Sequence, residues 1–299
     1  MTTAARAPVG STPSAIDALV PAEMARRAED LGAAKAGMDR VRLFALAVLA
    51  GAFIALGGVF ATVALAGTVQ APWGPARVLA GVVFSLGLVL VLVGGAELFT
   101  GNNLIVMAWA ARRVTTPQLA RNWVIVFCGN FVGAIGIAGL VFVGRTHEAG
   151  GGAFGSTALA IASTKLALGG AQAVALGILC NVLVCLAVWL TFSARSTTDR
   201  ILATVLPISA FVAAGFEHSI ANMYFVPLAL FIARFDPGFV VAHGLAGHAD
   251  ALSWSQFLVA NLVPVTVGNV IGGTLLVGIV YWFVYLRPVS HEPPVSTRP

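Results

Sequence analysis

Two short motifs place an acidic residue inside apolar sequence. They span residues 95–102 and 215–222, both read G-x-E-x-x-x-[GA]-N, and their acidic residues are Glu97 and Glu217. A charged side chain at the centre of a membrane helix costs about 2.5–3.5 kcal/mol on insertion scales, so its presence indicates a function. Each motif begins with a glycine, which loosens a helix. The pair therefore predicts two matched helix breaks, which are typical of a transport site near the bilayer midplane.

His218 is the residue in these motifs best suited to chemistry. It is the only histidine within a predicted membrane span, and it follows Glu217 directly. Its counterpart in the first motif is Leu98, so the repeated pattern does not require a histidine here. Because imidazole changes charge near neutral pH, we predict that His218 exchanges protons. The alternative is a histidine that only packs and hydrogen-bonds.

A helix break also exposes groups that select a ligand by charge. The N-terminus of a resuming half-helix carries partial positive charge and free N–H donors, which favour a small anion. We interpret Glu97 and Glu217, with Asn102 and Asn222 at the motif ends, as structural residues that hold the breaks in place. Their side chains are then expected to turn away from the path. The alternative is direct binding of a cation by the glutamates.

The composition identifies a membrane protein. Hydrophobic residues make up 59% of the 299 residues, charged residues 10%, and the mean hydropathy is +0.93. Each of six apolar stretches reaches the roughly 20 residues that cross a bilayer. The second and fifth are too long for one straight crossing, as broken spans would be. The predicted spans are 43–69, 78–111, 123–143, 166–192, 201–233 and 257–286.

Basic residues predict the orientation. If the N-terminus is cytoplasmic, only four of the 17 lysines and arginines fall in outer loops: Arg77, Arg145, Lys165 and Arg234. The positive-inside rule then places both termini in the cytoplasm. This asymmetry accounts for most of the net charge of +5, so the charge implies no nucleic-acid partner.

An internal repeat organises the spans. Residues 122–133 and 261–272 share the pattern N-x-V-x-V-x-x-G-N-x-x-G, so the third and sixth spans correspond, as the second and fifth do. Three spans per copy is an odd number, so the second copy enters the membrane from the opposite side. The sequence predicts an all-α integral membrane protein with six transmembrane helices in a 3+3 inverted repeat. Chance similarity between Gly-rich helices is the alternative.

The ends flank this pore domain of residues 43–287. We expect residues 1–42 to be a cytoplasmic segment in which a short amphipathic helix begins at Pro21, and residues 288–299 to be a cytoplasmic tail. For the helix, an interfacial anchor, a pore gate and a contact for a cytoplasmic enzyme are the alternatives. Lys165 begins the predicted fourth span at its outer edge. There it either extends its ammonium to the membrane surface or draws anions into an outer vestibule.

Four runs of residues carry a family resemblance. Residues 95–100, 177–189, 215–223 and 261–273 closely resemble the formate/nitrite transporter family, over roughly residues 21–287. The resemblance implies an aquaporin-like homopentamer in a bacterial inner membrane, with one pore per protomer. Formate-conducting members continue after the Phe-Thr pair with Ser-Thr-Val. This chain has Gly101-Asn102-Asn103, which is closer to other branches of the family.

The same resemblance implies roles for individual residues. Thr100 and His218 belong to the loops that break the second and fifth helices, Lys165 matches a vestibule lysine, and Asn181 matches a polar residue near the central histidine. Apolar constrictions are implied on both sides of these residues. Those on the cytoplasmic side are Phe84, Leu88 and Phe211, and those on the periplasmic side are Leu98, Phe99 and Val184.

Together these features predict a channel for formate and related small monovalent anions. An anion that enters a dry constriction loses its water at high cost, and a proton from His218 removes most of that cost. Nitrite and hydrosulfide are the alternative substrates. A membrane anchor subunit of a redox complex is the alternative class, but bis-histidine haem ligation needs a second membrane histidine. We expect no enzymatic activity, no metal and no cofactor, because the sequence shows neither a nucleophile beside a base nor a metal-ligand cluster.

Overall fold

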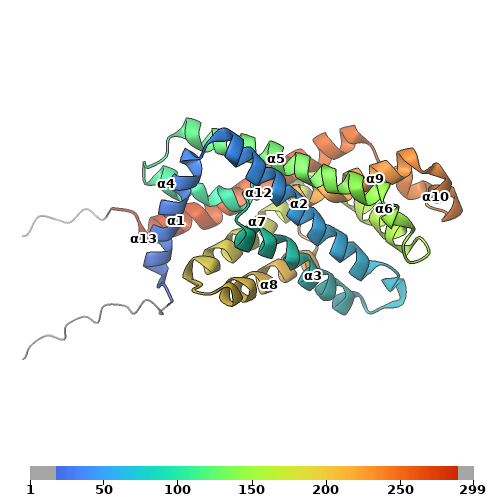
Figure 1. Cartoon of the computed structure of the whole chain (residues 1–299), viewed down its shortest axis with the longest axis horizontal. Helices are drawn as coiled ribbons and strands as arrows, with labels where there is room; N and C mark the ends of the chain where they lie inside the picture. Colours follow the sequence, from blue (N-terminus) through green and yellow to red (C-terminus); the bar gives the residue numbers. More distant parts are fainter. Residues whose placement is uncertain (1–17, 289–299) are drawn as a thin grey trace, which may run out of the picture.

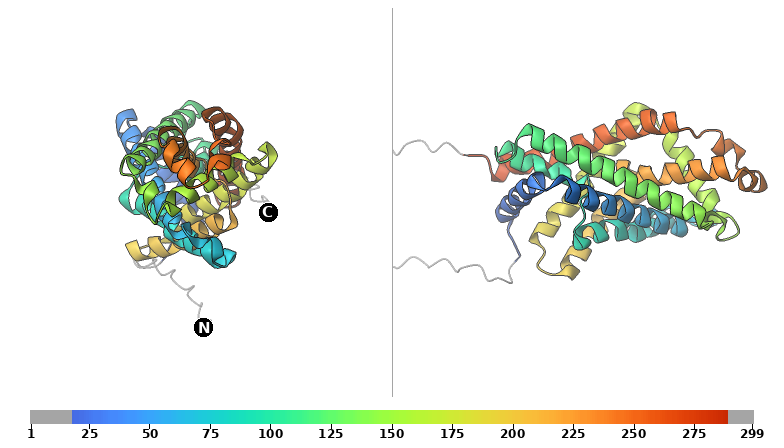
Figure 2. Two further views of the ribbon diagram at one scale, coloured as in Figure 1. Left: turned by 90° about the vertical axis from the view of Figure 1, so that its right-hand side faces the viewer. Right: turned by 45° about the horizontal axis from the view of Figure 1, so that its top comes forward.

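The computed structural model describes residues 18–288, and all the regular secondary structure in this range is helical. Six helices in this part of the chain are long and apolar enough to cross a membrane. The molecule is elongated, and its helices form a single bundle when seen along the long axis (Figure 2). Helices α1 and α13, the first and last of the described chain, lie at one end of the bundle, and α6 and α10 lie at the other (Figure 1). We call these the α1 end and the α6 end.

Each half of the chain contributes one copy of the repeat. The first half contains α1 (Pro21–Gly37), α2 (Arg40–Leu65), η1 (Thr68–Gln70), α3 (Trp73–Gly94), η2 (Gly101–Ile105), α4 (Val106–Ala110) and α5 (Thr116–Val143). The second half contains η3 (Thr146–Glu148), α6 (Ala153–Leu166), α7 (Gly170–Ser193), α8 (Thr197–Ala214), α9 (Ser219–Phe235), α10 (Pro237–Ala242), α11 (Ala246–Ala249), η4 (Gln256–Leu262), α12 (Val263–Val270), η5 (Ile271–Ile279) and α13 (Val280–Tyr285).

The two predicted helix breaks are present. Helix α3 ends at Gly94 and α8 ends at Ala214, and the next residue in each case is a left-handed glycine, Gly95 with φ of 78° and Gly215 with φ of 76°. A side chain would be strained in this conformation, so glycine is the residue that ends the helix here. The chain resumes as η2 and α4 after the first break and as α9 after the second.

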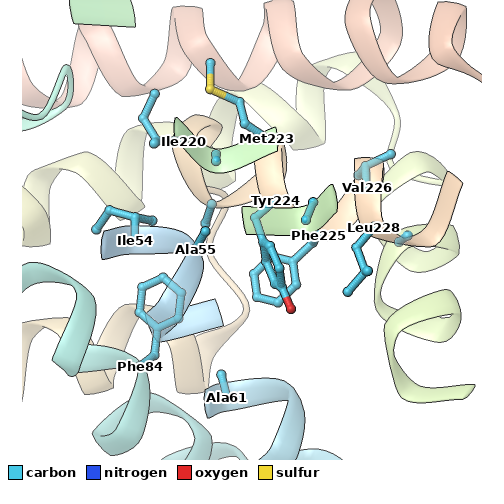
Figure 3. Close-up of a cluster of buried hydrophobic side chains, with 14 of the residues drawn as sticks. Ile54, Ala55, Ala61, Phe84, Ile220, Met223, Tyr224, Phe225, Val226 and Leu228 are labelled. Carbon is cyan, nitrogen blue, oxygen red and sulfur yellow. The ribbon is translucent and has the colours of Figure 1, made fainter. Parts of the chain in front are cut away.

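Helix α9 packs in the interior of the protein. Nearly all of its residues are buried, including Tyr224 and Met223 with no exposed surface. Figure 3 shows its side chains packed against Ile54 of α2 and Phe84 of α3. This enclosure fits a broken helix, because backbone groups freed by a break are tolerated at membrane depth only inside protein or beside a wet cavity.

Three features differ from the predicted organisation. The fourth span, α7, begins at Gly170 and not at residue 166, because the preceding residues form a separate helix, α6. The sixth span contains two π-helical segments, η4 and η5, whereas its counterpart α5 is a regular α-helix. Each repeat also has a fourth element, since α1 precedes the spans of the first copy and α6 those of the second.

Candidate functional site

A glutamate, an asparagine and a lysine hold the first break. The Glu97 carboxylate accepts hydrogen bonds from Asn102 Nδ2 (2.8 Å) and from Lys35 Nζ (3.1 Å). Asn102 Nδ2 also donates to Asn122 Oδ1 on α5 (3.0 Å). The buried carboxylate therefore has both a cation and an amide donor, which burial of a charge requires.

The second break is held by the equivalent residues. The Glu217 carboxylate accepts from Asn222 Nδ2 (2.7 Å) and from Lys165 Nζ (2.7 Å). Asn222 Nδ2 also donates to Asn261 Oδ1 (2.8 Å). Both glutamates thus bond the breaks in place. The expectation that their side chains turn away from the path stays a prediction, and Glu97 and Glu217 each line one of two cavities described below.

Lys35 and Lys165 are counterparts in the repeat. Each lies in the last turn of a helix that precedes the spans, α1 for Lys35 and α6 for Lys165. Their backbone carbonyls accept equivalent bonds from Asn122 Nδ2 (3.1 Å) and Asn261 Nδ2 (3.0 Å). Sequence analysis assigned no role to Lys35 and placed Lys165 at the start of the fourth span. The sequence signal that could have identified this pair is a lysine in the last turn of the helix that precedes each set of three spans.

Two asparagines satisfy the backbone at the breaks. Asn130 Nδ2 donates to the carbonyls of Ala47 (2.7 Å) and Glu97 (2.9 Å), and its Oδ1 accepts from Phe99 N (2.9 Å). Such bonds supply the partners that an interrupted helix loses. Asn130 and its counterpart Asn269 belong to the repeat pattern found in the sequence, which assigned them no role. In the second copy, Asn269 makes the three equivalent bonds to Gly177 O (2.8 Å), Glu217 O (2.9 Å) and Ser219 N (2.9 Å).

A hydrogen bond between Thr100 and His218 joins the two breaks. Thr100 Oγ1 lies 3.0 Å from His218 Nε2, and both residues are buried. His218 Nδ1 accepts from Ala221 N (3.0 Å), which caps the N-terminus of α9. Since Nδ1 accepts, the hydrogen of the neutral ring lies on Nε2 and is donated to Thr100 Oγ1. The repeat counterparts of this pair, Ile220 and Leu98, are both apolar.

Two cavities lie on either side of this contact. The cavity at the α6 end has a volume of about 360 Å³ and is lined by Lys165, Glu217 and His218, together with Arg77. The cavity at the α1 end has a volume of about 280 Å³. Its charged lining residues are Arg27, Lys35, Glu97 and Arg200.

The charges in both cavities favour an anion. At the α6 end two cationic side chains accompany one carboxylate, and at the α1 end three accompany one carboxylate. Clefts with a surplus of one sign of charge concentrate ligands of the opposite sign. At the α6 end, Arg77 donates to the carbonyls of Val212 (2.8 Å) and Ala213 (3.3 Å), in the last turn of α8 before the second break.

The constriction residues are divided between the two cavities differently from the prediction. Phe84 and Phe211, with ring centroids 5.7 Å apart, line the cavity at the α6 end, whereas Leu98 lines the cavity at the α1 end. The prediction grouped Phe84 and Phe211 with Leu88, but Leu88 lines the same cavity as Leu98, so this grouping is wrong. The reason is the direction of the chain. Helix α3 begins at the α6 end and runs toward the α1 end, so Phe84, which precedes the break, lies toward the α6 end. Leu98 follows the break and lies toward the α1 end.

The other predicted residues have buried positions near the first break. Leu88 lines the cavity at the α1 end. Phe99 packs edge-on against Phe127, and Val184 is buried on α7. Asn181 Nδ2 donates to Asn269 O (2.6 Å) and approaches Thr100 O at 3.4 Å, so Asn181 supports the break loops rather than His218 directly.

The histidine arrangement disfavours the haem-anchor alternative. Within residues 18–288, His218 is the only histidine between the cavities, and His147, His243 and His248 lie at the α6 end with partners there. His147 Nε2 donates to Asp236 (3.0 Å), and this bond holds the pKa of Asp236 below its usual value. His291 lies outside the described residues. The described residues also contain no group of three or more His, Cys, Asp or Glu that could hold a metal.

Comparison with known proteins gives consistent matches over nearly the whole chain. The sequence profile of the formate/nitrite transporter family matches residues 22–283. The chain is 45% identical to the formate channel FocA of Escherichia coli K12 over 278 residues, covering 92% of this chain and 98% of the relative. It is 40% identical to FocA of Haemophilus influenzae, covering 88% of this chain and 93% of that one.

Solved structures show the same fold. A pentameric formate channel with formate bound matches with a TM-score of 0.76 and 43% identity, covering 83% of this chain and 98% of that one. An ion channel of the same family matches with a TM-score of 0.74 and 25% identity, covering 88% and 98%. The chain is therefore a multi-pass membrane protein that belongs to the formate/nitrite transporter family.

Proposed function

We propose that this protein is a channel that passes formate and related small monovalent anions, with proton exchange at His218. The observation that carries the proposal is the Thr100–His218 hydrogen bond, which lies beside a cavity with surplus positive charge and links the two breaks. The relatives named as formate channels support formate as the substrate. Phe84, Phe211, Leu88 and Leu98 form the apolar collars that the substrate crosses.

The geometry at His218 supports proton exchange by the ring. A charged imidazolium carries hydrogen on both nitrogens, so its Nδ1 cannot accept from Ala221 N. Charging the ring therefore breaks the cap of α9, and loss of the proton restores it. The ring takes up a proton from water on the entry side, a bound formate removes this proton and becomes formic acid, and the ring is neutral again. The neutral acid crosses the apolar collar at lower desolvation cost. On the other side the acid releases its proton to water.

A flux comparison in proteoliposomes tests the proposal. Formate, nitrite, hydrosulfide, lactate and ammonium are compared side by side at equal gradients. We expect formate to pass fastest, with uptake of protons, and ammonium to be excluded by the cationic cavities. Nitrite or hydrosulfide passing faster than formate would assign the chain to another branch of the family, as Gly101-Asn102-Asn103 in the first break allows. Fast ammonium flux would contradict an anion path.

Assembly and orientation give a second test. We propose a homopentamer in a bacterial inner membrane, with residues 1–42 and the tail 288–299 in the cytoplasm around a pore domain of 43–287. The placement of α1 and α13 at one end of the bundle supports termini on one side. Native mass measurement should give five protomers, and reporters fused to either terminus should be cytoplasmic. A stable monomer or a periplasmic C-terminus would contradict this proposal.

A further inference from the structure

The polar support of Thr100 has no equivalent in the other repeat. The bonds from Glu97 N to Leu46 O and from Glu217 N to Leu176 O align α2 with α7. In this alignment the counterpart of Asn181 is Gly51. The break motifs likewise align Asn103 with Met223. The first break therefore has a buried asparagine pair, Asn103 and Asn181, where the other copy has apolar or small residues.

This asparagine pair connects both breaks. Asn103 Oδ1 accepts from Asn181 Nδ2 (2.8 Å), and Asn103 Nδ2 donates to Phe99 O (3.2 Å). Asn181 Nδ2 also donates to Asn269 O (2.6 Å), and the side chain of Asn269 bonds the backbone on either side of His218. The amide of Asn181 thus contacts the backbone of Thr100 in the first break and also Asn269, which holds the loop of His218 in the second.

We propose that Asn103 is a positioning residue for this contact. Its Oδ1 fixes the amide of Asn181, so that the Thr100 hydroxyl is held within hydrogen-bond distance of His218 Nε2. The carbonyl of Thr100 is fixed in the same way by Asn181 Nδ2 and by Cys185 Sγ, each at 3.4 Å. Asn103 thereby sets the pH range of proton exchange without touching the substrate. This inference rests on the proposed role of His218.

Isosteric substitutions separate the hydrogen bond from packing. Asn103→Val removes the acceptor, whereas Asn103→Thr has the same shape as valine and keeps an oxygen. In Asn103→Val, Asn181 Nδ2 retains Asn269 O as an acceptor, so its buried donor keeps a partner. We expect the valine variant to shift the pH midpoint of formate flux by about 0.5–1 unit toward lower pH, the size that one hydrogen bond supplies. The threonine variant should shift it less.

The other ionisable groups near His218 are unchanged in these variants. They are Lys165 on α6, Glu217 in the break, Arg77 on α3, Cys180 and Cys185 on α7, and Tyr224 on α9. Met223→Leu, at the repeat counterpart of Asn103, is the matched control and should leave the pH midpoint unchanged. Equal shifts in the valine and threonine variants, or none in either, would overturn the role of the Asn103 oxygen.

A second measurement does not depend on transport. The ¹⁵N spectrum of histidine-labelled pentamers in nanodiscs reports which ring nitrogen carries hydrogen, and His218→Asn identifies the His218 signals. We expect the native signals to show hydrogen on Nε2 and the valine variant to show a mixture of tautomers. A mixture in the valine variant supports positioning even if proton coupling proves absent. An unchanged tautomer together with an unchanged pH midpoint would overturn the inference.

Discussion

Replacing His218 with Asn will abolish the pH dependence of formate flux that the imidazole confers, measured over a range of about pH 3 to 8, because asparagine cannot titrate. Formate-driven proton movement in vesicles should fall by about 100-fold, the lower part of the range for a positioned proton donor. The pentamer should persist, because an asparagine oxygen can still accept from Ala221 N and cap α9. The measurement is proton uptake driven by a formate gradient across this pH range.

The control for this experiment is a histidine away from the path. His248 Nδ1 lies 2.8 Å from Ser163 Oγ at the α6 end, outside both cavities. His248→Asn should therefore leave proton movement and its pH profile unchanged. If a well-folded His218→Asn pentamer kept full proton coupling, the proton-exchange hypothesis would be lost, and the pore would be a passive path set by its collars and charges.

The breaks and the inverted repeat could be predicted because their physical cost appears in the sequence. A carboxylate and a left-handed glycine inside an apolar stretch are expensive unless they serve a break, and both occur twice in the same order. The third and sixth spans could be paired because Asn130 and Asn269 must satisfy the same freed backbone groups. Residues with identical bonding tasks in both copies are thus constrained to one residue type.

The helices before each set of spans were less accessible to sequence reasoning. Helix α6 follows a run of glycines and ends beside an apolar stretch, so its last residue, Leu166, was taken as the start of the predicted fourth span. Lys35 lies in an amphipathic segment in which a lysine is unremarkable. Its partner Glu97 is 62 residues further along the chain, and only the folded chain shows the ion pair.

The grouping of the collar residues was wrong for a different reason. Resemblance transferred the residue types of Phe84, Phe211 and Leu98, but the side on which each lies depends on the direction of its helix. With α1 cytoplasmic, α2 crosses outward and α3 returns inward, so Phe84 comes before the midplane. Chain direction alone could have corrected this assignment.

The ion pair at the second break gives the other large expected effect. Lys165→Gln leaves the buried Glu217 carboxylate without its cation, which for a fully buried pair costs about 3–5 kcal/mol. Because the Lys165 side chain is 15% exposed, we expect about 2–3 kcal/mol of lost stability. The α6-end cavity would then hold one cation, Arg77, against one carboxylate. Because the cavity loses its surplus positive charge, we expect the anion flux of the variant to fall about tenfold at low salt.

The double variant Lys165→Gln with Glu217→Gln separates the two roles of Lys165, the ion pair with Glu217 and the attraction of anions into the cavity. If the lysine acts mainly as the partner of Glu217, the double variant should recover most of the stability that the single variant loses. Lys35→Gln is the matched control in the first repeat. Its side chain is 33% exposed, so water screens the remaining Glu97 carboxylate and the loss should be about 1 kcal/mol. Pentamer stability in denaturant and formate flux at two salt concentrations are the measurements. Strictly additive losses in the double variant would show that Lys165 and Glu217 act independently.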